Sequence, residues 1–353
     1  MESGNQKGRR SNQPLIVIYY GIWSISGTIS YFISGSGGNM SILNSKGQTV
    51  KSKRFLSEEK KDMISGYLYV APFFIIFGII GLYPAVFSIY LAFQKWNGLS
   101  PMTFAGLDNF KVVLEDPLFW KSVYNTIIMG LMGTAPQLIV GIILAFLLNL
   151  TFLRFRNFFR VTIFMPYITS MVAVALIFSV LFSNHESSLA NYVLGLFGFD
   201  PVNWATSEWG TKIAISIMVF WRWVGYNTII YLAGIQSISN DLYEAATIDG
   251  ANKFQQLLYI TMPLLKPFII LTVFFSTVGA LQLFSEPTVF LGTGAFTRDE
   301  AMTVVMYLYR DAFKLQSFGT ASATAVILLF IIIIFSAINT MFTSGLGRKR
   351  RRV

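Results

Sequence analysis

The sequence Tyr243-Glu-Ala-Ala-Thr-Ile-Asp-Gly-Ala251, followed by Ile260-Thr-Met-Pro263, lies in a polar loop between two long apolar segments. Asn240 or Asp241 can cap a helix that begins just before the first stretch. Gly250 is suited to end that helix in the left-handed conformation. The proline of the second stretch is expected to stop another short helix. The pattern therefore predicts two short helices in a loop that leaves one apolar segment and returns into the next.

Glu244 has two compatible interpretations. It lies three residues after Asp241, which is the spacing of a capping box. It can also make a polar contact to a partner protein. The neighbouring Ala245, Ala246 and Ala251 are small, so the surface of a partner can approach the backbone of this helix closely.

The composition indicates a membrane protein. Of the 353 residues, 54% are hydrophobic and 12% are charged, whereas soluble domains have about 25% charged residues. There is no cysteine, which excludes disulfides and thiolate metal sites, and one histidine, His185, argues against a histidine-ligated metal. The net charge is +10. Its Lys and Arg residues are concentrated in the segments that flank the predicted spans, so it does not indicate nucleic-acid binding.

Six segments are long and apolar enough to cross the membrane, which takes about 20 helical residues. We place them near residues 67–93, 120–150, 161–182, 211–234, 268–290 and 318–342. The spans contain Pro72, Pro84, Pro136 and Pro166. These prolines predict kinks whose freed carbonyls are satisfied by neighbouring helices or water.

The positions of Lys and Arg predict the orientation of the spans. Segment 46–61, connection 154–160 and tail 348–352 are rich in these residues, whereas 184–210 has none. Positively charged loops stay in the cytoplasm. Both ends of the six-span core, and the loop that contains Glu244, are therefore expected on the cytoplasmic side.

The first 65 residues form an extension before the six-span core, which covers residues 66–342 and is followed by a basic tail at 343–353. Residues 15–33 are moderately apolar but contain several Ser, Gly and Thr. They fit an extra span, an interfacial helix, or a start codon assigned too early. Residues 34–39 (Ser-Gly-Ser-Gly-Gly-Asn) read as a flexible linker.

The polar loop resembles the coupling motif of ABC-importer permeases, which is Glu-Ala-Ala, three residues, Gly, nine residues, Ile-x-Leu-Pro. The matching positions are Glu244, Ala245, Ala246, Gly250, Ile260 and Pro263. Met262 stands where the family usually has leucine. The resemblance implies that the loop at 235–267 contacts an ATPase through Glu244, Ala245, Ala246, Asp249, Gly250, Ala251 and Pro263.

Further stretches resemble the carbohydrate branch of these permeases, of the maltose-importer type. They are Phe104-Ala-Gly-Leu-Asp-Asn-Phe110, Trp221-Arg-Trp-Val-Gly-Tyr-Asn227 and Tyr307-Leu-Tyr-Arg310. The matches cover roughly residues 66–342. The loop at 291–296 departs from the Gly-Gly-Pro often found there.

The resemblance implies an all-α, multi-pass permease subunit with the six-helix core of type I importers, in the plasma membrane of a bacterium. Its expected partners are a second homologous permease, two ATPase subunits and an extracytoplasmic sugar-binding protein. The expected substrate is a mono- or oligosaccharide. ATP and Mg would be bound by the ATPases, because this chain has no Gly-x-x-x-x-Gly-Lys-Ser/Thr loop.

Sugar sites combine aromatic faces with a few placed polar groups. Mid-span residues of these types predict a substrate pathway that contains Asn125, Tyr167, Trp223, Asn227, Gln282, Phe284 and Glu286, and Gln137 is a further candidate. Gln282, Phe284 and Glu286 are expected on one side of the fifth span. Arg222 is a costly charge inside a span. It can extend outward to the membrane surface, pair with a carbonyl, hold a helix of a partner subunit, or take a direct role in the pathway.

An ion-coupled secondary transporter is the alternative function. It would need carboxylates or unwound repeat helices near the middle of the membrane. Glu286 is the one acid inside the predicted spans, and no internal repeat is evident. An intramembrane enzyme lacks a plausible catalytic set.

Overall fold

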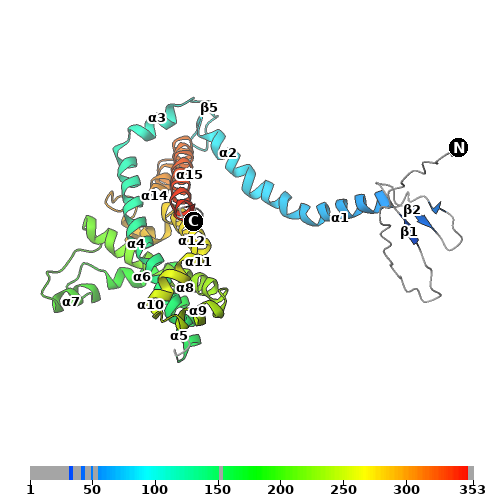
Figure 1. Cartoon of the computed structure of the whole chain (residues 1–353). Helices are drawn as coiled ribbons and strands as arrows, with labels where there is room; N and C mark the ends of the chain where they lie inside the picture. The colour runs from blue at the N-terminus through cyan, green and yellow to red at the C-terminus, as the bar shows by residue number, and fades with distance from the viewer. Residues whose placement is uncertain (1–31, 35–40, 44–48, 51–54, 151–153, 349–353) are drawn as a thin grey trace, which may run out of the picture. The chain divides into compact units, whose positions relative to one another are not determined.

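The computed structural model is almost entirely helical, as expected (Figure 1). It describes residues 32–34, 41–43, 49–50, 55–150 and 154–348. The chain divides into two compact units, residues 1–84 and 85–353. Each unit is described by itself below.

The first unit contains a small antiparallel sheet and the first long helix. The strands are β1 (Phe32–Ser34), β2 (Ser41–Leu43) and β3 (Thr49–Val50), with Phe32 opposite Leu43. The helix consists of α1 (Phe55–Ile76), the π-helical η1 (Phe77–Leu82) and α2 (Tyr83–Leu91), which ends in the second unit. Residues 15–31 of the possible extra span lie outside the described residues, and that prediction stays untested.

The second unit is built from helices and one two-stranded ribbon. Its elements are β4 (Gln94–Lys95), β5 (Thr103–Phe104), α3 (Asp108–Glu115), α4 (Pro117–Asn149), α5 (Arg156–Ile168), α6 (Met171–Leu181), α7 (Leu189–Leu196), α8 (Glu208–Gln236), α9 (Asn240–Ile248), α10 (Lys253–Gln256), η2 (Leu257–Thr261), α11 (Met262–Leu264), α12 (Lys266–Leu281), α13 (Ser285–Leu291), η3 (Gly292–Gly294), α14 (Val304–Tyr309), η4 (Arg310–Lys314) and α15 (Phe318–Arg348).

Among the residues that the structure describes, four helices are long and apolar enough to cross a membrane, at Asp62–Leu91, Pro117–Asn149, Glu208–Gln236 and Phe318–Met341. Two bent helix pairs raise the number to six if each pair is one span. This agrees with the six spans expected from the sequence. The third span bends after Pro166, where a kink was predicted, whereas the fifth span ends earlier than predicted.

The third span is not one straight helix, because α5 and α6 meet at an angle of 93°. Pro166 lies in the last turn of α5, and Thr169 and Ser170 adopt extended conformations that end the helix. Arg222 donates a hydrogen bond from Nη1 to the carbonyl oxygen of Thr169 at 3.1 Å. The guanidinium of Arg222 thus satisfies a carbonyl oxygen that the break leaves without a helical partner. Pairing with a carbonyl was one of the roles considered for Arg222.

The fifth span ends earlier than expected. α12 stops at Leu281, and Gln282 to Phe284 leave the helical conformation before α13 begins. Thr303 donates a hydrogen bond to the carbonyl oxygen of Leu283 at 2.6 Å, which satisfies one group freed by the break. Gln282, Phe284 and Glu286 therefore do not share one helix, and the expectation that they lie on one helix side was wrong.

The core of the second unit is centred on the pair α4 and α8. Fully buried apolar residues of both helices pack there, among them Met129, Ile215 and Met218. At the start of α8, the buried Lys212 pairs with Glu208 at 2.7 Å. Such a buried charge is tolerated because it is paired.

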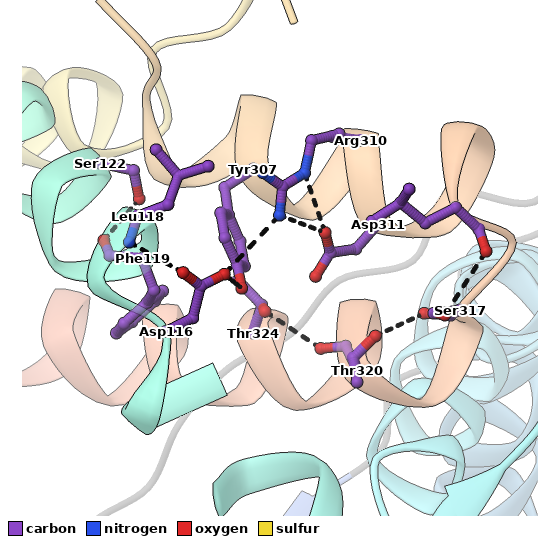
Figure 2. Close-up of polar contacts among 11 residues, drawn as sticks. Asp116, Leu118, Phe119, Ser122, Tyr307, Arg310, Asp311, Ser317, Thr320 and Thr324 are labelled. Atoms are coloured by element: carbon purple, nitrogen blue, oxygen red, sulfur yellow. Dashed lines mark hydrogen bonds and ion pairs between the residues drawn. The ribbon is translucent and has the colours of Figure 1, made fainter. Parts of the chain in front are cut away.

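A polar cluster joins the start of α4 to η4, as Figure 2 shows. Asp116 caps α4 by accepting a hydrogen bond from the backbone of Leu118 at 2.8 Å, and it accepts another from the Tyr307 hydroxyl at 2.8 Å. Arg310 lies over the Tyr307 ring and pairs with Asp311 at 2.9 Å. Burial raises the pKa of Asp311, while the hydrogen bond and charge of Arg310 oppose the rise. The cluster fixes the entry to α4 against α14 and η4.

Candidate substrate cavity and coupling loop

A cavity of about 400 Å³ opens between four helices and the break after α12. This volume lies in the range of small-molecule sites. Its lining residues come from α4, α5, α8, α12 and α13: Thr134, Gln137, Tyr167, Val219, Trp223, Tyr226, Phe275, Ser276, Gly279, Ala280, Gln282, Leu283 and Glu286.

One wall of the cavity is a cluster of three aromatic rings. Tyr167 stacks on Tyr226 with ring centroids 4.7 Å apart. Trp223 meets both rings edge to face, at 5.3 Å from Tyr167 and 5.8 Å from Tyr226. Because Trp223 and Tyr226 are three positions apart on α8, they present neighbouring rings on one face. The cluster forms an apolar surface with polar edges.

Polar groups complete the lining. Gln137 is 2% exposed, and its carbonyl oxygen has no hydrogen-bond partner within the part of the chain that the structure describes. A buried polar atom without a partner costs about 1–3 kcal/mol. A ligand hydroxyl or a water molecule that donates to Gln137 would remove this cost. Gln282 and Ser276 add an amide and a hydroxyl to the same cavity.

The loop between α8 and α12 forms two short helices, as predicted, but its first cap differs from the prediction. Ser239, rather than Asn240 or Asp241, is the N-cap of α9, and its hydroxyl accepts a hydrogen bond from the backbone of Asp241. With Ser239 as the N-cap, a capping box needs its partner at residue 242, so Glu244 lies two residues too far along α9. Its side chain is exposed, so the capping interpretation of Glu244 was wrong and the partner contact stays a prediction.

Gly250 ends α9 in the left-handed conformation, with φ of +80°. The backbone N–H of Ala251 donates to the carbonyl of Ala246 at 2.8 Å, and that of Gly250 to Thr247 at 3.1 Å. These two bonds are the pattern of a Schellman motif. The predicted glycine cap is therefore confirmed, and it fixes the direction of the chain between α9 and α10.

The loop is rigid on its inner side and apolar on its outer side. Gln256 is 2% exposed and donates a hydrogen bond to the Thr247 hydroxyl at 2.9 Å, which ties α10 to α9. Ile248 is 86% exposed and Phe254 is 66% exposed. Exposed apolar residues on a polar loop commonly mark an interface with another protein.

Residues 137–348 match the family model described as binding-protein-dependent transport system inner membrane component. The chain belongs to this family. The matched region runs from Gln137 in the cavity through the coupling loop at 235–267 to the end of α15. The inner membrane component described here is therefore a multi-pass membrane protein of an ABC transporter. Nothing in this relationship supports the ion-coupled alternative.

Named relatives and solved structures agree with this family. The chain is 32% identical over 301 residues to the arabinooligosaccharides transport system permease protein AraP of Halalkalibacterium halodurans, covering 85% of this chain and 94% of the relative. It is 34% identical over 277 residues to the lactose transport system permease protein LacF of Rhizobium radiobacter, covering 77% and 92%. The fold is similar to a chain of a bacterial ABC transporter involved in alginate import, with 23% identity and a TM-score of 0.71, covering 84% and 100%.

The cavity brings together four of the seven predicted pathway residues, namely Tyr167, Trp223, Gln282 and Glu286. The other three lie elsewhere among the described residues. Asn125 is buried and donates to the carbonyl oxygens of Asp299 at 2.8 Å and Met302 at 3.1 Å. Asn227 is 1% exposed between α8 and α4. Phe284 packs on Tyr309, with centroids 5.3 Å apart.

Tyr226, Thr134 and Ser276 line the cavity but were not among the predicted residues. Tyr226 follows Trp223 by three positions, and this helical spacing was a usable signal. Thr134 likewise precedes Gln137 by three positions on α4. Ser276 carried no such signal, because its place depends on how α12 packs against the other helices.

Proposed function

We propose that this inner membrane component is the permease subunit of an ATP-driven importer that carries a mono- or oligosaccharide delivered by an external binding protein. The names of its relatives suggest arabinooligosaccharides or lactose as the kind of substrate. The observation that carries the proposal is the cavity. It combines three aromatic rings, two glutamine amides and the unpartnered Gln137 oxygen, which suit a ligand with apolar C–H faces and many hydroxyls.

The coupling loop supports a link to ATP hydrolysis. Two ATPase subunits, which bind ATP and Mg, would contact Glu244, Ala245, Asp249 and Gly250 on this chain and the equivalent loop of a second permease. Movement of the loop would be passed to α8 and α12, which begin or end at its two sides and which both line the cavity. This chain would then have no catalytic role of its own.

Uptake by the reconstituted importer tests the cavity. Trp223→Ala is expected to raise the sugar concentration for half-maximal uptake about tenfold, because one aromatic contact is worth roughly 1.5 kcal/mol. Gln282→Ala should weaken uptake in the same direction. Labelled arabinotriose or lactose taken up into proteoliposomes measures both effects.

Trp221→Ala is the matched control, since Trp221 lies on the same helix but does not line the cavity. It is 40% exposed and packs on Phe178, 5.5 Å away. We expect it to keep the wild-type sugar dependence. Equal uptake by the Trp223 and Trp221 variants across low sugar concentrations would place the pathway elsewhere.

We also propose that the basic tail at 343–353 and the loop at 235–267 are cytoplasmic, from the distribution of Lys and Arg. Because the chain has no cysteine, single cysteines report sidedness directly. Cysteine at Ser344 is expected to resist an impermeant thiol reagent in intact cells and to react after the cells are opened. Cysteine at Ser187, in the loop between α6 and α7, should react in intact cells. The opposite labelling pattern would reverse the topology.

A further inference from the structure

We infer that Glu286 makes the cavity selective for uncharged sugars over sugars that carry a carboxylate or sulfonate group. The inference rests on the proposed function and narrows its substrate class. Among the described residues that line the cavity, Glu286 has the one carboxylate, and no Lys or Arg lines it. The remaining polar groups, such as Gln137, Gln282 and Ser276, are uncharged.

Glu286 is held where a ligand would meet it. It lies in the first turn of α13, directly before the buried Pro287, and it lines the same cavity as Trp223. Trp223 in turn packs edge to face on Tyr167 and Tyr226. The carboxylate therefore shares one cavity with the aromatic wall, and a sugar ring placed on that wall would bring its rim groups towards Glu286.

Arg222 is the cation that acts on Glu286, but it faces another part of the structure. Its guanidinium donates to the Thr169 carbonyl at the break between α5 and α6, and it is not among the residues that line the cavity. A ligand in the cavity is therefore nearer to the carboxylate than to the guanidinium. Arg222 attracts Glu286 without offering a second partner to an acidic sugar.

The chemistry at the carboxylate separates the two classes of sugar. A hydroxyl can donate a charge-assisted hydrogen bond to Glu286, and such bonds are about twice as strong as neutral ones. A ligand carboxylate in the same place offers no proton and repels the side chain. Two like charges a few ångströms apart in a partly buried site cost enough to lower affinity by about tenfold or more.

Equilibrium dialysis with the purified permease–ATPase complex, in the absence of the binding protein, tests the inference directly. The probes are three trisaccharides of similar size: neutral arabinotriose, acidic trigalacturonate, and an amine-bearing chitosan trimer. The wild-type complex is expected to bind arabinotriose at least about tenfold more tightly than trigalacturonate. Glu286→Gln should raise the affinity for trigalacturonate relative to arabinotriose by about tenfold, and Glu286→Lys should raise this ratio further. The chitosan trimer should lose affinity relative to arabinotriose in both variants.

The controls separate the inference from the proposed function. Glu115→Gln removes an exposed carboxylate, which pairs with Lys111 at 3.9 Å, and it should leave all three affinity ratios unchanged. Size-exclusion chromatography checks that each variant complex is intact. If the wild type binds none of the sugars, the proposed function fails. If it binds arabinotriose but the ratios do not respond to Glu286, only the inference about charge fails.

Discussion

Replacing Gly225 with alanine is expected to destabilise the permease by about 2 kcal/mol or more. Gly225 is buried in α8, where a Cβ atom would collide with the backbone carbonyl of Ile163 and lie 3.2 Å from the Cα of Phe164 in α5. Since the clashing atoms belong to the backbone, no side-chain rotation can relieve the contact. α5 and α8 would have to move apart, as happens when larger residues replace small ones between membrane helices.

The thermal unfolding midpoint of the detergent-solubilised protein measures this effect. The shape of the cavity should change as well, because its lining residues Tyr167 on α5 and Trp223 and Tyr226 on α8 lie close to this contact between the helices. Gly195→Ala is the matched control. Gly195 lies within α7 with no described atom within 4 Å of an added Cβ, so alanine should leave stability unchanged or raise it slightly. An unchanged midpoint for Gly225→Ala would show that α5 and α8 are not packed as closely as described.

The number of membrane segments could be predicted from the sequence, because hydrophobicity and length are local properties. The shapes of the third and fifth spans could not. Pro166 signalled a kink, but a bend of 93° depends on Arg222, which is more than fifty positions away and satisfies the Thr169 carbonyl. The end of α12 likewise depends on Thr303, which bonds the carbonyl of Leu283.

The candidate site, too, could be predicted only in part from the sequence. Tyr167, Trp223, Gln282 and Glu286 were chosen by residue type, and they meet in the cavity because α5, α8, the break after α12 and α13 converge there. Phe284 was chosen on the assumption of a continuous helix. The break after Leu281 turns its ring towards Tyr309 instead. Asn125 has the right chemistry, but its donors are already used by the carbonyls of Asp299 and Met302.

Replacing Gly250 with tryptophan is expected to reduce sugar uptake to background, while the protein still inserts into the membrane. Gly250 has a φ of +80° at the exposed end of α9, and no described atom lies within 4 Å of an added Cβ. The Cβ of the new side chain therefore meets no described atom, and the side chain begins at an exposed position. It would instead fill the space in which a docked ATPase approaches the backbone at Ala246 and Ala251. Uptake into proteoliposomes and co-purification of the ATPase measure the loss.

Two control variants distinguish the effect of a bulky side chain at the ATPase interface from the effect of backbone strain at residue 250. Gly250→Ala adds the cost of a left-handed non-glycine residue, about 1–2 kcal/mol, with little bulk, and it should retain most of the uptake. Gly198→Trp places the same large side chain at a φ of +78°, in the loop after α7, where an added Cβ also meets no described atom within 4 Å. It should keep the ATPase bound. If Gly250→Trp supports wild-type uptake, or if Gly198→Trp releases the ATPase equally, the loop at 235–267 is not the contact through which ATP hydrolysis drives transport. The ATPase would then have to act on another surface of the permease.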